Sequence, residues 1–229
     1  MEFECEWNTK VRIEREWVTN MSNKLILLTT TYSEAVKDYS EEWPEDLGYA
    51  SLEEDAEDLV ALCEECWGVF VVCGEEQEAA RLAEAMQLTQ SLREKTICLE
   101  GYEGKHYFKH CIRVGQDVEE GLFQLLDMVF LPGAINLDLL DLRSFVKSTN
   151  YAYQDFRGDL NSVKEQVKTF LMESTATGCM ANIFGDVGIS EATEVMELFA
   201  GFEDILFGIT VLETEDNEVQ LSLIYDYYS

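Results

Sequence analysis

Residues 130–145 read FLPGAINLDLLDLRSF, and this stretch decides how the rest of the chain is interpreted. The pair Pro132-Gly133 ends the largely apolar helix predicted over residues 117–130, because proline cannot continue a helix and glycine favours the turn that follows one. A further helix is predicted over residues 137–147. Asp138 and Asp141 stand at its start, where acidic side chains are favoured by the helix dipole. The stretch therefore predicts a polar loop between two helices.

Short apolar runs upstream of this stretch predict buried strands over residues 24–30, 69–73 and 95–99. Between them, Ser51 with Glu54 three residues later forms a capping-box pattern that predicts a helix ending at Gly68. A second helix is predicted over residues 75–88. Strands that alternate with helices of this length indicate a parallel α/β sheet.

The part downstream of residue 147 has a different order of predicted strands and helices. It predicts strands at 151–156 and 178–184, helices at 161–173 and 190–199, and two closing strands at 204–212 and 218–227. The polar residues 214–217 predict a turn that joins the closing strands as a hairpin. We therefore expect an α+β layer, in which a sheet carries helices on one face.

The composition restricts the partners. The chain of 229 residues carries 46 acidic and 16 basic residues, a formal net charge of −30. Nucleic acid and anionic membrane surfaces are excluded as partners, since both need clustered Lys and Arg. A salt-loving source would be one simple explanation of this charge. The seven cysteines, an odd number, and an acidic start without a secretory signal predict reduced thiols and a cytoplasmic location.

The pattern Pro-Gly-x-Ile-Asn-x-Asp-x-x-Asp in residues 132–141 resembles the synergy loop of the FtsZ family. Residues 178–184, 204–210 and 218–224 resemble later strands of that family in the same order. The resemblance implies an α/β fold: a reduced Rossmann-like parallel-sheet domain (1–115), a central helix with the synergy loop and the next helix (116–147), and an FtsZ/tubulin-type α+β domain (148–229). In that family the loop enters the nucleotide pocket of the next subunit.

The resemblance also implies roles for single residues. Asp138 and Asp141 correspond to acids that act on GTP in the neighbouring subunit, so they are candidate catalytic residues in trans. Asn136 and Gly133 are candidate binding residues of the same loop. The alternative interpretation is that Asp138 and Asp141 only cap and charge the following helix. Both interpretations can hold together.

The glycine-rich nucleotide loops of the family are missing. Residues 53–72 resemble the helix and strand that precede its Gly-Gly-Gly-Thr-Gly run, but Gly74, Glu75 and Glu76 stand where that run should begin. A phosphate loop needs free N–H groups and a helix N-terminus without acids of its own. Residues 1–23 contain no glycine either. Residues 25–38 resemble the family's second strand and the loop after it, with 9–17 as a substitute for the first strand. We therefore expect no bound GTP, no other cofactor and no metal.

The leading hypothesis is a non-catalytic FtsZ-like protein that binds or modulates FtsZ/tubulin-type polymers, with an FtsZ/tubulin-like protein or a second copy of itself as partner. The alternatives are a divergent GTPase with a remodelled site and a stand-alone interaction scaffold. Cys63 and Cys66 have metal or redox spacing, but the apolar periodicity favours a core position for Cys63. His106 and His110 lack the glutamate of a zinc motif, so residues 101–110 are predicted to be a surface connection.

Overall fold

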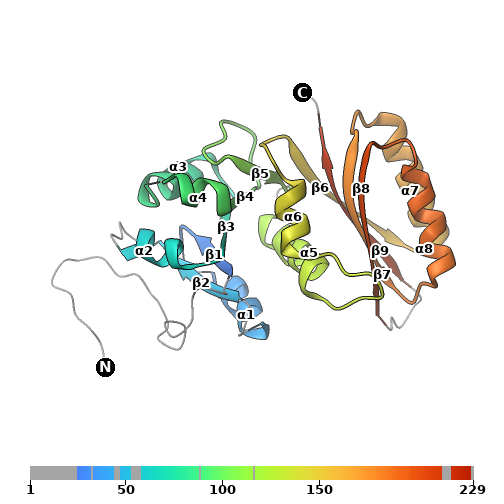
Figure 1. Cartoon of the computed structure of the whole chain (residues 1–229), viewed down its shortest axis with the longest axis horizontal. Helices are drawn as coiled ribbons and strands as arrows, with labels where there is room; N and C mark the ends of the chain where they lie inside the picture. The colour runs from blue at the N-terminus through green and yellow to red at the C-terminus, as the bar shows by residue number, and fades with distance from the viewer. Residues whose placement is uncertain are drawn as a thin grey trace. The chain divides into compact units, whose positions relative to one another are not determined.

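The computed structural model describes residues 25–31, 33–43, 47–52, 58–87, 89–115, 117–212 and 218–227. The strand predicted at 9–17, the turn at 214–217 and the capping partner Glu54 lie outside these residues. The chain divides into two compact units, residues 1–110 and 111–229 (Figure 1). No helix within the described part is long and apolar enough to cross a membrane.

The first unit is a parallel sheet with connecting helices. Its elements are β1 (Leu25–Thr29), α1 (Glu34–Glu42), β2 (Leu47–Ser51), α2 (Asp58–Glu65), β3 (Gly68–Cys73), α3 (Glu76–Ala85), α4 (Gln90–Lys95) and β4 (Thr96–Glu100). The strand order is β2-β1-β3-β4, with every described pair parallel. All residues of β1, β3 and β4 are buried, as expected of a parallel sheet whose two faces are covered. The predicted parallel α/β arrangement is confirmed.

One local prediction in this unit is wrong, and two helices were not predicted. Ser51 does not open a helix: it is the last residue of β2, buried and paired with Thr29, because strand pairing outweighs the local capping pattern. Helices α1 and α4, capped by Ser33 and Thr89, were not predicted. Strand β1 lies between β2 and β3 in the described sheet. The strand at 9–17, with which β1 was predicted to take the family's second place, lies outside the described residues, so this assignment stays a prediction.

The second unit contains β5 (His110–Arg113), α5 (Val118–Phe130), α6 (Leu139–Phe145), β6 (Tyr151–Gly158), α7 (Leu160–Glu173), β7 (Gly178–Gly185), α8 (Ile189–Met196), η3 (Glu197–Phe199), β8 (Asp204–Val211) and β9 (Val219–Asp226). Its strand order is β5-β6-β9-β7-β8. Strand β9 is antiparallel to both neighbours, whereas β7 and β8 are parallel.

This order contradicts the predicted hairpin of the two closing strands. Strand β9 inserts between β6 and β7, and β8 lies on the other side of β7. The different burial of β8 and β9 explains why β9 takes the interior position. Most of β9 is buried and gains a hydrogen-bonding neighbour on each side, while β8 has exposed residues at both ends and suits an edge. The polar turn pattern carries no information about which strands pair.

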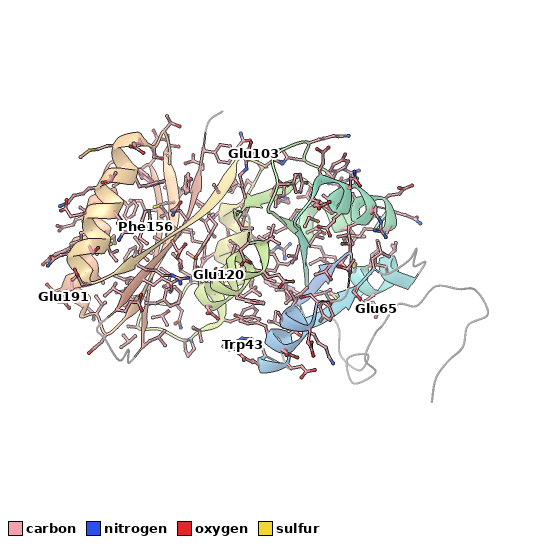
Figure 2. All side chains as sticks on the ribbon, turned by 180° about the vertical axis from the view of Figure 1, so that it is seen from behind. Trp43, Glu65, Glu103, Glu120, Phe156 and Glu191 are labelled. Atoms are coloured by element: carbon pink, nitrogen blue, oxygen red, sulfur yellow. The ribbon has the colours of Figure 1, made fainter. Side chains whose placement is uncertain are left out.

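The sheet of the second unit is covered on both faces, by α7 and α8 on one and by α5 and α6 on the other (Figure 1). Alternate residues of β7, namely Cys179, Ala181 and Ile183, belong to the apolar core that includes Val163 and Val167 of α7. Phe156 of β6 lies in the same layer (Figure 2), with its ring edge-on to Phe170 at 5.7 Å between centroids. The intervening residues of β7, such as Asn182, project to the opposite face.

Candidate functional site

The loop after β3 in the first unit is closed by a side chain of its own helix. The Glu78 carboxylate accepts the backbone N–H of Gly74 at 2.7 Å and that of Glu75 at 3.0 Å, both through Oε2. Its Oε1 accepts the Thr30 hydroxyl at 2.7 Å. We call this set of contacts the Glu78 bridge. It joins the carboxyl ends of β1 and β3, the edge at which open α/β sheets bind ligands.

The backbone at Gly74 does not require a glycine. Its φ lies outside the left-handed region, and a Cβ added there would meet only Glu78 Oε2, at an ordinary 3.6 Å. A residue with a side chain would fit, so the one glycine left from the expected run has no special conformational task. The free N–H groups that the family's loop would offer to phosphate are already bonded to Glu78.

The prediction named Gly74, Glu75 and Glu76 as the degenerate loop and gave Glu78, a further acid of the same stretch, no role in closing it. The structure places Gly74 directly after β3, Glu75 at the N-cap of α3 and Glu76 at the first position of α3. Glu78 is the residue that closes the loop. The signal was present in the sequence as an acidic residue three positions after Glu75, the spacing of a capping box.

The connection between β4 and β5 lies against this helix start and against the end of β4. The Tyr107 hydroxyl donates to Glu76 Oε1 at 3.2 Å, and Gly104 is so close to the Glu76 carboxylate that a Cβ there would lie 2.4 Å from Oε2. Residues 101–109, which were predicted to be part of a surface connection, therefore also contact α3. Tyr107 and the backbone at Gly104 make these contacts, both with Glu76 of α3.

A buried carboxylate ends β4. Glu100 is only 1% exposed; its Oε1 accepts the Tyr102 hydroxyl at 3.1 Å, and its Oε2 lies 2.7 Å from His106 Nδ1. Burial, and to a smaller extent the charge of Glu100, raises the pKa of Tyr102, so the phenol stays protonated and donates its hydrogen bond. His110, the second histidine, is buried in β5. The carboxyl edge of this sheet thus presents acids, and an added phosphate would meet like charges.

The second candidate place, in the other unit, is the loop of residues 131–138 with the start of α6; we call it the 131–141 loop. Asp138 is the N-cap of α6. Its Oδ1 accepts the N–H groups of Leu140 at 2.7 Å and Asp141 at 2.9 Å, and Asp141 Oδ2 accepts the N–H of Asp138 at 3.0 Å. The capping role is therefore present. These bonds use one oxygen of each carboxylate, so the capping role leaves a second oxygen on each acid.

The remaining predicted residues hold the loop itself. Asn136 Oδ1 accepts the N–H of Gly133 at 2.6 Å, which turns the Asn136 side chain back onto its own loop. Ile135 forms an isolated antiparallel bridge with Ile209 of β8, with N–O distances of 3.3 and 2.8 Å. The structure therefore brings the four predicted residues, Gly133, Asn136, Asp138 and Asp141, into one ordered turn.

Several apolar side chains of the 131–141 loop and of the end of β8 are exposed. Ile135 is 47% exposed and Leu140 is 60% exposed, and Val211 at the end of β8 is 51% exposed. Sequence reasoning missed these three because apolar periodicity alone cannot show which residue of a helix or strand end is left uncovered. Exposed apolar residues beside polar ones are typical of a protein-binding surface.

The two cysteines with metal or redox spacing are not accessible to solvent. Cys63 and Cys66 are buried, and the Cys66 thiol donates to the carbonyl oxygen of Leu62 at 3.1 Å. Burial raises the pKa of Cys63 to about 12, so its thiol stays protonated at neutral pH. These contacts support the core interpretation of Cys63 over a metal or redox role.

The first unit is a parallel α/β sheet, and the second is a mixed sheet that contains helix α5 and the polar loop after it. This combination defines an FtsZ/tubulin-like fold. No protein-family model and no curated protein sequence matches the chain. Solved structures do. The FtsZ W319Y mutant from M. jannaschii is similar with a TM-score of 0.58 and 15% identity, over 92% of this chain and 93% of that one.

Two CetZ structures are similar as well. The CetZ of Methanosaeta thermophila gives a TM-score of 0.55 at 13% identity, over 91% of this chain and 88% of that one. CetZ2 of Haloferax volcanii, solved as a GTPγS-bound protofilament, gives 0.54 at 10% identity, over 89% and 92%. The predicted FtsZ/tubulin-like fold is confirmed. At these identities the likeness shows the fold alone.

Proposed function

We propose that this chain is a tubulin-like cytoskeletal protein that does not bind GTP itself and that binds or modulates polymers of an FtsZ/tubulin-type partner through its 131–141 loop. The Glu78 bridge is the observation that carries the first half of this proposal. The exposed acids and apolar side chains of the loop support the second half.

The energetics of the Glu78 bridge oppose a nucleotide. A triphosphate placed on the N–H groups of Gly74 and Glu75 must first displace Glu78, and hydrogen bonds to a charged group contribute about 1.5–3 kcal/mol each. A phosphate charge about 4 Å from a carboxylate is then repelled by about 4 kcal/mol at an effective dielectric near 20. Micromolar affinity amounts to only about −8 kcal/mol in total, so these two costs suffice to prevent binding.

The 131–141 loop supplies a surface for a partner. Its turn is fixed by internal hydrogen bonds, which lowers the entropy lost when it docks. Ile135 and Leu140 offer apolar area, and Asp138 and Asp141 offer charge that discriminates between partners. In a head-to-tail polymer the two contact faces differ. A subunit with one competent face joins one end of the polymer and stops its growth.

The first experiment measures polymer formation. A GTP-competent FtsZ-like protein is assembled with GTP, and light scattering is followed as this chain is added below equimolar ratio. Scattering should fall. The double variant Asp138→Asn/Asp141→Asn keeps the cap, since asparagine caps helices as well as aspartate, but removes both charges. It should restore scattering.

A matched control is Asp159→Asn, which changes the N-cap of α7, where Asp159 accepts the N–H of Ser162 at 2.9 Å. This variant should inhibit the polymer as the unmodified chain does. Unchanged scattering with an equimolar amount of the unmodified chain would refute the partner half of the proposal.

The second experiment tests nucleotide binding directly. A ligand at about 100 times its dissociation constant stabilises a protein by about 2.7 kcal/mol, which is readily seen as a rise in melting temperature. We expect millimolar GTP with Mg²⁺ to leave the melting temperature of this chain unchanged. A reproducible rise with GTP, absent with Mg²⁺ alone, would contradict the first half of the proposal and favour a divergent GTPase.

A further inference from the structure

The 131–141 loop lies on β8 through contacts that tolerate no side chain on two glycines. A Cβ at Gly133 would lie 2.1 Å from the carbonyl oxygen of Ile209. A Cβ at Gly208 would lie 2.2 Å from Asn182 Oδ1 and 2.9 Å from Leu137 Cγ. Neither glycine has a left-handed φ. Each is therefore required for close approach and not for a special backbone conformation.

Asn182 cannot easily move away from Gly208. It is 1% exposed in the middle of β7, in register with Gly208, and its Nδ2 donates to the Thr210 hydroxyl at 2.9 Å. Its Oδ1 is buried without a hydrogen-bond partner among the described residues. The oxygen therefore faces the bare Cα of Gly208, held there by the bond at the other end of the amide.

The loop packs against the same position. Leu137 is 6% exposed, and its Cγ and Cδ1 would lie 2.9 and 3.1 Å from the Cβ of residue 208 that would clash with Asn182. The next residue is Asp138, whose backbone and side chain set the start of α6. Asn182 in the sheet and Leu137 in the loop therefore both pack at Gly208, and Leu137 directly precedes Asp138, the first acid of the loop.

We infer that Gly208 is a positioning residue for the 131–141 loop: its lack of a side chain lets Leu137 lie flat on β8 and so sets the direction in which Asp138 and Asp141 face a partner. This inference rests on the proposed function only for the use of the loop. The placement of the loop itself is a property of this chain. A methyl group at residue 208 would clash with Asn182 Oδ1 and would also press on the Leu137 side chain, so it would disturb the packing of the loop on β8.

The test is amide hydrogen exchange of the free protein. In Gly208→Ala, the amides of Ile135 and Ile209, which form the bridge between loop and strand, should exchange at least about tenfold faster, as expected of a local opening. The amide of Leu223 in β9 should keep its rate. The matched control is Gly201→Ala, because a Cβ there meets no atom within 4 Å.

Two further variants keep the test decisive. Leu137→Ala removes the contact without introducing a clash and should also speed exchange at Ile135 and Ile209, so it replaces Gly208→Ala if that variant does not fold. Asn182→Ala in the Gly208→Ala background makes room for the added methyl group and should slow exchange again. Unchanged rates at the bridge in Gly208→Ala, or in Leu137→Ala where it replaces that variant, overturn the inference.

The polymer assay then separates the two proposals. Faster exchange together with lost inhibition of the partner polymer supports both of them. Faster exchange with full inhibition supports the positioning role and contradicts the use of the loop in partner binding.

Discussion

Replacing Glu78 with alanine tests the central contact of the first unit. The variant removes the acceptor shared by Gly74, Glu75 and Thr30. The Thr30 residue is 2% exposed, so water cannot easily take the place of the carboxylate, and a buried hydroxyl left without its partner costs about 1–3 kcal/mol. The lost negative charge at the start of α3 costs about another 0.3–1 kcal/mol.

We therefore expect Glu78→Ala to lower the free energy of unfolding by about 2–4 kcal/mol. In a protein of this size each kcal/mol lowers the melting temperature by about 2–4 °C, so the expected change is about 4–16 °C. Urea unfolding followed by circular dichroism gives the free energy, and a thermal scan gives the melting temperature.

The matched control is Glu84→Ala, an exposed glutamate of the same helix, which should change stability by less than about 0.5 kcal/mol. Thr30→Val completes a double-mutant cycle with Glu78→Ala, and the two changes should be less than additive because they remove one shared contact. If Glu78→Ala is no more destabilising than Glu84→Ala, the Glu78 bridge does not stabilise the fold and our reasoning about the occupied loop is wrong.

Three further outcomes are expected. The Lys109 ammonium, by its hydrogen bond to Glu94, lowers the pKa of that carboxyl; the stability that the pair contributes is therefore present above the ordinary pKa of Glu94 and is lost as the pH falls through the lowered one. A carbon-detected NMR titration of Lys109→Ala should show the pKa of Glu94 return toward its ordinary value. In a Cys5→Ser background, Ellman's reagent should find almost no reactive thiol in the native protein and six after denaturation, since Cys63 and the other described cysteines are buried. Asp226→Ala should destabilise the second unit by about 2–4 kcal/mol, measured by urea unfolding, because its carboxylate accepts two backbone N–H groups and the Thr177 hydroxyl.

The amino-acid sequence by itself determined the regular elements that local patterns encode. Short apolar runs predicted β1, β3 and β4, because burial on both faces leaves a nearly continuous apolar run. Helical periodicity predicted α5 and α7, because burial of one stripe leaves a period of about 3.6 residues. The capping pair Asp138 and Asp141 was also readable, since both residues act within one helical turn. So was the absence of a glycine run after Val72.

Only the tertiary structure decided which distant groups meet. The Glu78 bridge joins residues 48 positions apart, and no local pattern links Thr30 to α3. The insertion of β9 between β6 and β7 depends on which strand gains most from two hydrogen-bonded neighbours, a comparison among all strands of the sheet. The closeness of Asn182, Gly208 and Leu137 likewise follows from strand register and chain return. Such contacts depend on the packing of the whole unit, and no local sequence pattern shows that the residues involved will meet.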